Sequence, residues 1–112
     1  MKAMYLTEPF SLEFRDDEPM PEITQPDDVI IKIAYSGICP WDVRVYNGKK
    51  NVPLPRILGH EATGTVVESG DNVSDLPEGT RVVADFIVKC GICDMCRTGR
   101  SNKCRQPQFL KG

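Results

Sequence analysis

The sequence has little histidine and tryptophan: His60 is the only histidine and Trp41 the only tryptophan in 112 residues. It has no apolar run near the ~18 residues of a membrane span, and its N-terminus lacks a signal-peptide core. It also has no basic stripe and no block of like charge, and its formal net charge is -2. We therefore expect a cytoplasmic protein with no membrane and no nucleic-acid partner.

The composition is typical of a globular protein, with 40% hydrophobic and 27% charged residues. A chain of this length predicts one domain, 1–112, that buries roughly 60–70% of the surface its unfolded chain exposes. Five cysteines is an odd number. Because no export signal is present, reduced thiols that are available to a metal are favoured over a disulfide framework.

Short strands dominate the predicted secondary structure. Alternating and β-branched patterns between turn residues predict strands over 2–6, 11–15, 28–35, 61–69 and 80–88. The one predicted helix runs from Pro40 to Tyr46, because proline suits the first helical position and Asn47-Gly48 can stop a helix. Cys39 then lies at the N-cap. Many short strands with little helix predict a mainly β fold, a small barrel or sandwich.

Four cysteines lie close together near the end of the sequence with the spacing C-x2-C-x2-C-x7-C: Cys90, Cys93, Cys96 and Cys104. The loop that contains them, about 89–105, is polar and without periodicity, so it offers no core in which thiols could be buried. A tetrahedral zinc would organise such a loop. The alternatives are unmetallated thiols and an iron–sulfur cluster, whose bacterial motif has its fourth cysteine sooner and before a proline. The spacing favours structural zinc.

A second, incomplete set of ligands is formed by Cys39, His60 and Glu61, which lie in glycine-flanked turns at the ends of predicted elements. On spacing alone, a shared metal site and a chance grouping of buried residues are equally supported. Asp42, one helical turn after Cys39, could accept the other imidazole N–H and fix its tautomer.

Two sequence motifs resemble those of one known family. Gly59-His60-Glu61-Ala62-Thr63-Gly64, followed by Gly70 and Val73, is similar at every position to the zinc-containing alcohol dehydrogenase signature G-H-E-x2-G-x5-G-x2-V. Gly37-Ile38-Cys39, with Asp42, resembles the catalytic-cysteine motif of the same medium-chain dehydrogenase family. The four-cysteine spacing resembles its structural-zinc loop.

The resemblance implies a GroES-like, partly open β-barrel with one short helix and a zinc-binding cysteine lobe. It implies one structural zinc in the lobe and one catalytic zinc held by Cys39 and His60, with Glu61 as a nearby or alternate ligand and a further ligand from beyond residue 112. Such a domain is the N-terminal catalytic part of an NAD(P)-linked alcohol or polyol dehydrogenase. The zinc would polarise the oxygen of a small alcohol or carbonyl substrate during hydride transfer.

The sequence departs from the family pattern at two positions of the proton relay. Trp41 replaces the usual serine or threonine, and an indole donates a hydrogen bond but accepts none. Arg44 stands where a histidine is often found, and it is always protonated. We therefore expect the usual hydroxyl–imidazole relay to be absent.

The sequence also lacks a G-x-G-x-x-G fingerprint, so no Rossmann cofactor domain is expected within it. We expect a fragment or truncated product that is inactive alone and that uses NAD or NADP only with a downstream Rossmann domain. A bare barrel face would favour self-association into a homo-oligomer. The alternatives are a stand-alone zinc-binding structural or interaction module, and a co-chaperonin of the same fold, which rests on fold analogy alone.

Overall fold

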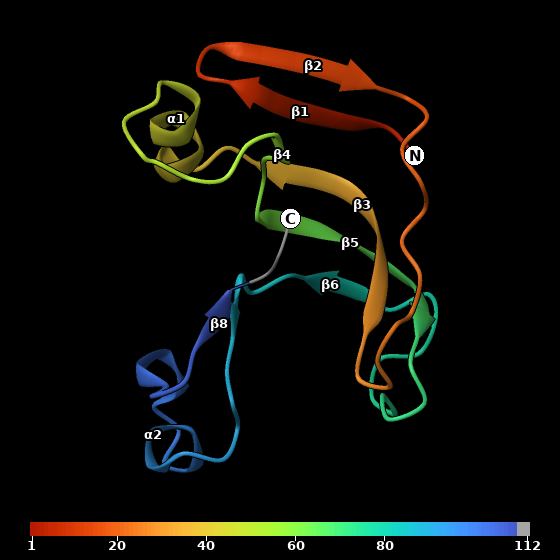
Figure 1. Cartoon of the computed structure of the whole chain (residues 1–112). Coiled ribbons are helices and arrows are strands. Elements are labelled where there is room, and N and C mark those ends of the chain that lie inside the picture. Colours follow the sequence, from red (N-terminus) through yellow and green to blue (C-terminus); the bar gives the residue numbers. More distant parts are fainter. Residues whose placement is uncertain (110–112) are drawn as a thin grey trace.

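Strands dominate the computed structural model of the chain, which describes residues 1–109 (Figure 1). The strands are β1 (Ala3–Glu8), β2 (Ser11–Arg15), β3 (Val29–Gly37), β4 (Arg56–Ile57), β5 (Glu61–Ser69), β6 (Arg81–Val83), β7 (Ile87–Val88) and β8 (Gln108–Phe109). The helical segments are α1 (Pro40–Tyr46), α2 (Asp94–Arg97) and the 3-10 turn η1 (Ser101–Lys103). None of the helices within 1–109 is long and apolar enough to cross a membrane.

The strands form three antiparallel sheets with the orders β2-β1-β4, β3-β5-β6 and β7-β8. The longest pairing joins β3 to β5, from Val29 opposite Ser69 to Gly37 opposite Glu61. Its register shifts between Ile30 and Ile31 and again between Ile33 and Tyr35. Such irregularities bend and twist a strand, which suits a curved sheet. The predicted mainly β fold with one short helix is confirmed.

Three predicted elements have the bounds that the sequence indicated: 11–15, 61–69 and the helix 40–46. The prediction of one strand over 80–88 is wrong, because the segment divides into β6 and β7, which belong to different sheets. At the break, Asp85 Oδ1 accepts a hydrogen bond from the backbone N–H of Ile87 at 3.0 Å. A local bond of this kind competes with the hydrogen bonds of a sheet. The two-residue strands β4 and β8 were not predicted.

The core contains side chains from well-separated parts of the sequence. The fully buried side chains are Leu6 of β1, Val45 of α1 and Val66 of β5. Val45 is the residue through which the short helix is anchored, because most of the other α1 side chains are at least partly exposed. Val45 thus attaches to the core the helix whose N-terminus carries Cys39.

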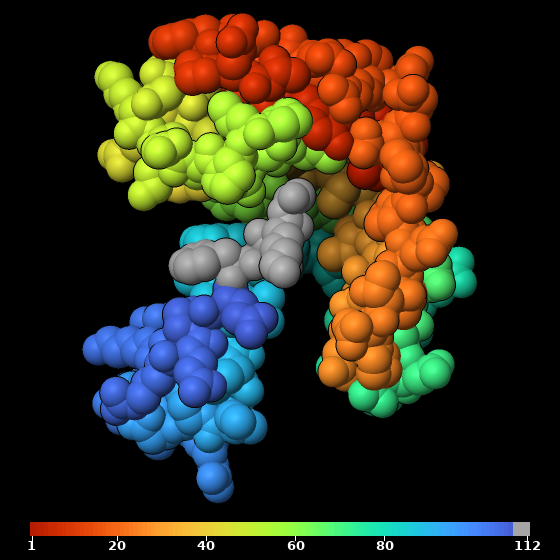
Figure 2. Space-filling view, viewed as in Figure 1, coloured from red at the N-terminus to blue at the C-terminus, as the bar shows by residue number. Residues whose placement is uncertain are grey.

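The four-cysteine lobe projects from the rest of the molecule. Figure 2 shows it, in blue, as a separate knob below the strands and α1. The radius of gyration is 15.7 Å, larger than the about 13 Å expected of a compact domain of this length. The lobe therefore depends on its own interactions for its structure more than on burial against the barrel.

Candidate metal centres

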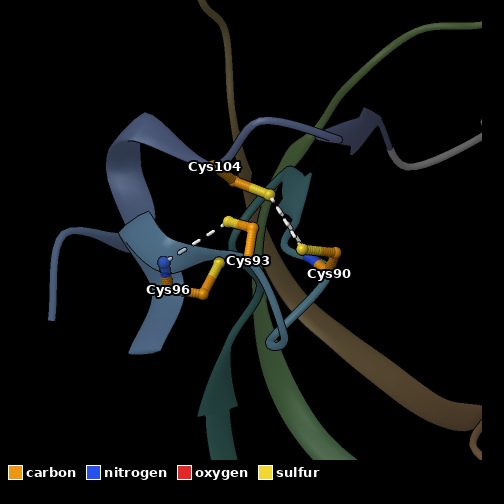
Figure 3. A group of neighbouring side chains, drawn as sticks. All are labelled: Cys90, Cys93, Cys96 and Cys104. Atoms are coloured by element: carbon orange, nitrogen blue, oxygen red, sulfur yellow. Dashed lines mark hydrogen bonds between the residues drawn. The ribbon is translucent and has the colours of Figure 1, made fainter. Parts of the chain in front are cut away.

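The four cysteines of the lobe converge on one point. The Sγ atoms of Cys90, Cys93, Cys96 and Cys104 lie within 4.8 Å of one another, and each residue is half-buried. Figure 3 shows the four side chains turned toward a common centre between α2 and the flanking loops. A zinc tetrahedron with Zn–S bonds of about 2.3 Å separates its sulfurs by about 3.8 Å. The four sulfurs therefore fit a zinc ion with little movement.

Backbone N–H groups surround these sulfurs. Cys93 is the N-cap of α2, and its Sγ accepts the N–H of Cys96 at 3.5 Å. Cys104 Sγ accepts the N–H groups of Cys90 and Gln106, both at 3.4 Å. Cys104 Sγ also lies 3.5 Å from Cys90 Sγ. N–H donors aimed at sulfur stabilise the thiolate, which is the form that binds metal.

The pKa values of the lobe thiols differ widely. The backbone N–H groups of Arg105 and Cys96 lower the pKa of Cys93 to about 6. The backbone N–H groups of Cys90 and Gln106 lower the pKa of Cys104. Burial, and the hydrogen bond with Cys93, raise the pKa of Cys96 to about 12. Two of the thiols are thus biased toward the thiolate, while Cys96 needs a cation beside it to lose its proton.

An ion pair links the start of α2 to the segment after the last cysteine of the lobe. Arg105 donates Nε to Asp94 Oδ1 at 2.6 Å and a terminal nitrogen to Oδ2 at 2.7 Å, a bidentate arrangement. The guanidinium lowers the pKa of the Asp94 carboxyl. The pair joins the first residue of α2 to the residue that follows the last cysteine. It therefore links the residue after Cys93 to the residue after Cys104.

The second predicted group is also assembled. One ligand atom each of Cys39, His60 and Glu61 lies within 4.8 Å of the others. Cys39 is the N-cap of α1, just after β3; His60 precedes β5; and Glu61 begins β5 opposite Gly37. Three protein ligands with a fourth position open is the arrangement of catalytic rather than structural zinc sites. The donor set, a thiolate, an imidazole and a carboxylate, suits zinc.

Two glycines make room for this group. Gly59 has φ +105, and a Cβ there would lie 3.0 Å from Ser36 Oγ. At Gly37, a Cβ would lie 2.5 Å from Glu61 Oε2, so the missing side chain leaves the space that the carboxylate occupies. The backbone turn before His60 and the position of the Glu61 carboxylate thus both depend on glycine.

Asp42 connects two members of the group. It is 5% exposed, and no other polar or charged residue within 1–109 is buried. Its Oδ2 accepts the backbone N–H of Cys39 at 2.9 Å. Its Oδ1 lies 3.5 Å from His60 Nδ1 and has no hydrogen-bond partner among the described residues. The predicted neighbours are therefore brought together, at a distance that is slightly too long for a formed hydrogen bond.

Aromatic side chains flank the imidazole of His60. The Trp41 ring lies 5.5 Å away at an interplanar angle of 85°, and the Phe86 ring lies 5.3 Å away at 63°. The guanidinium carbon of Arg56 lies 5.5 Å from the centre of the Trp41 ring. The sequence did not indicate that Phe86 or Arg56 lies here, since no spacing or motif connects these two residues with His60.

Known proteins are similar to this chain in sequence and fold. Residues 25–112 match the profile of the family described as "Alcohol dehydrogenase GroES-like domain". The chain is 39% identical over 109 residues to L-threonine 3-dehydrogenase of Mesorhizobium japonicum, covering 94% of this chain and 31% of that protein. It is 31% identical over 106 residues to zinc-type alcohol dehydrogenase B of Aspergillus flavus, covering 95% of this chain and 24% of that protein.

Galactitol-1-phosphate dehydrogenase from Escherichia coli has a similar structure, with a TM-score of 0.87 and 28% sequence identity. That similarity covers 100% of this chain and 32% of the other. The chain thus spans about a third or less of the length of these relatives. The region they share contains both the four-cysteine lobe and the Cys39–His60–Glu61 group.

Proposed function

The chain belongs to the family of alcohol dehydrogenase GroES-like domains, and on this premise we propose that it is the catalytic domain of a zinc-dependent, NAD(P)-linked dehydrogenase. Its substrate would be a small alcohol or polyol, or the corresponding carbonyl compound. The observation that carries the proposal is the convergence of Cys39, His60 and Glu61 within 4.8 Å beside the buried carboxylate of Asp42. The three ligands leave a position open, which a purely structural site does not need.

Each residue of this group has a separate role in the proposal. Cys39, His60 and Glu61 would hold the zinc. With Nδ1 of His60 turned toward Asp42, Nε2 is the atom left for the metal, and Asp42 fixes the tautomer that presents it. When bound, zinc supplies Lewis acidity that polarises a carbonyl or favours ionisation of an alcohol. Trp41 and Phe86 shield the imidazole, whose side chain is 18% exposed, from water.

Proton transfer follows a different route from the family's usual one. The indole of Trp41 cannot accept a proton, and Arg44, which is exposed, cannot relay one at neutral pH. Among side chains in direct contact with the metal ligands, Asp42 has an oxygen without a hydrogen-bond partner in the described residues. Because neither Trp41 nor Arg44 can pass a proton on, the proton would leave through solvent.

The lobe has a structural role in the proposal. Cys90, Cys93, Cys96 and Cys104 would hold a second zinc through four protein ligands. These four bonds would stabilise a projecting loop that has little apolar burial of its own.

The proposed substrate class is taken from the names of the similar proteins. Their names specify threonine, an alcohol and galactitol 1-phosphate, all of which carry the hydroxyl group that such an enzyme oxidises. Because the 112 residues contain no dinucleotide fingerprint, NAD or NADP would be bound by a Rossmann domain encoded downstream.

The experiment compares the 112 residues with the same chain fused to its native downstream sequence. Both are assayed with NAD and NADP against alcohols, polyols, hydroxy amino acids and aldehydes. We expect turnover by the fusion alone, and its loss when Cys39 is replaced by serine. A fusion that holds zinc but oxidises none of these substrates would favour the stand-alone zinc module instead. Turnover by the 112 residues at the rate of the fusion would refute the need for a second domain.

A further inference from the structure

Arg56, Trp41 and His60 form a continuous row of contacts that ends at the candidate catalytic group. The Arg56 guanidinium carbon is 5.5 Å from the Trp41 ring centre, and the Trp41 ring centre is 5.5 Å from that of His60. From this row we infer that Arg56 is a positioning residue, which fixes the His60 imidazole by holding the indole of Trp41. Its effect on metal binding rests on the proposed function, whereas its effect on the two rings does not.

The backbone of Arg56 is held firmly. It lies in β4 opposite Leu6 of β1, and Leu6 is fully buried. The neighbouring Ile57 pairs with Tyr5 in the same sheet. The Arg56 side chain therefore extends from the β2-β1-β4 sheet, and its contact with Trp41 holds the indole relative to that sheet.

The charged guanidinium of Arg56 contacts the indole of Trp41. Its Nε is buried and has no hydrogen-bond partner within residues 1–109, and no carboxylate lies within ion-pair distance in that part of the chain. A guanidinium stacks favourably on the face of tryptophan, and it is more weakly hydrated than an ammonium. Because Arg56 has no acidic partner, its contact with the Trp41 ring is the interaction that stabilises its charge in this position.

Trp41 transmits this restraint to the imidazole. It is the second residue of α1, and its ring stands nearly perpendicular, at 85°, to that of His60. Phe86, the other flanking ring, lies in the link between β6 and β7 and is 40% exposed. Asp42 is 3.5 Å from Nδ1, too far to fix the ring by itself. The indole, which Arg56 contacts, is therefore the neighbour through which β4 restrains the imidazole's angle.

The test uses the fact that the chain has one histidine and one tryptophan. NMR of the zinc-free protein gives a single set of imidazole resonances, whose shifts report the ring current of Trp41, and the fluorescence reports the indole's surroundings. Arg56→Met and Arg56→Gln should both move the His60 resonances toward those of a Trp41→Leu variant and shift the emission. Arg56→Lys, which keeps the cation, should restore most of both signals.

The matched control is Arg81→Met, the same change at an exposed arginine in β6. It should leave both signals at their wild-type values. Arg56→Met added to Trp41→Leu should change nothing further, because the ring through which Arg56 acts is absent. Wild-type imidazole shifts in both Arg56→Met and Arg56→Gln would overturn the inference.

The metal readout separates this inference from the proposed function. Competition with a zinc indicator should show about two- to fivefold weaker binding at the Cys39 group in Arg56→Met, with unchanged binding at the lobe. If the wild-type protein binds zinc at the lobe alone, the proposed function fails, and the NMR result still decides the role of Arg56. Equal affinities in wild type and Arg56→Met, with moved imidazole shifts, would overturn the link between ring position and metal binding.

Discussion

Asp42 Oδ1 lies 3.5 Å from His60 Nδ1, while the other oxygen of the same carboxylate accepts the backbone N–H of Cys39 at 2.9 Å. One buried side chain therefore touches two of the three candidate ligands. The bond to Cys39 closes the first turn of α1. The approach to His60 favours the tautomer that has its proton on Nδ1. A single residue thus caps the helix and selects the tautomer of a candidate ligand.

Replacing Asp42 by asparagine should weaken zinc binding at the Cys39 group by about 10–100-fold. The amide has a single oxygen, so it cannot accept from both the Cys39 N–H and the imidazole N–H. Isothermal titration after selective loading of the lobe measures the effect. Asp75→Asn, at an exposed position, is the matched control. Wild-type affinity in Asp42→Asn would show that Asp42 only caps the helix.

Alkylation of the zinc-free protein should modify Cys93 much faster than Cys96. Its pKa of about 6 makes it mostly thiolate at pH 7, whereas the pKa of about 12 keeps Cys96 protonated. Only the thiolate attacks iodoacetamide, so we expect Cys93 to react at least about tenfold faster, even allowing for its lower intrinsic nucleophilicity. The rate at Cys93 should fall as the pH is lowered through about 6. Cys93 and Cys96 lie on the same tryptic peptide, so fragment-ion mass spectrometry of that peptide gives the two rates. Equal labelling of the two cysteines at pH 7 would contradict the prediction.

Replacing Gly64 by alanine should destabilise the barrel by about 1–3 kcal/mol, the usual effect of overpacking. A Cβ at Gly64 would lie 2.2 Å from the carbonyl oxygen of Lys32 and 2.8 Å from Ile31 Cγ2, so β3 and β5 would have to separate. Urea denaturation measures the free energy of unfolding. Val67→Ala changes a partly exposed residue of the same strand and should cost less than about 1 kcal/mol. A Gly64→Ala variant as stable as wild type would contradict the prediction, because it would mean that β3 and β5 can accommodate the added methyl group without loss of stability.

The features predicted from the sequence are those that depend on short spacings. Pro40 and Asn47-Gly48 gave the bounds of α1, and the cysteine spacing predicted a group that the structure brings together. The contacts of Arg56 and Phe86 could not be predicted in this way. They join residues 15 to 26 positions from Trp41 or His60 and depend on how β4 and the β6–β7 link fold back. The division of 80–88 was missed because the Asp85 turn interrupts an otherwise continuous apolar pattern.

Zinc content per chain tests the two-centre account most directly. Elemental analysis after reconstitution with zinc should give two ions in the wild-type chain, one in Cys39→Ser and one in Cys93→Ser, with the double variant binding none. Cys39→Ser should keep the lobe intact by NMR, whereas Cys93→Ser should loosen it, because metal binding there is local folding free energy. A single zinc in the wild-type chain that is unaffected by Cys39→Ser, or iron in place of zinc at the lobe, would contradict the account.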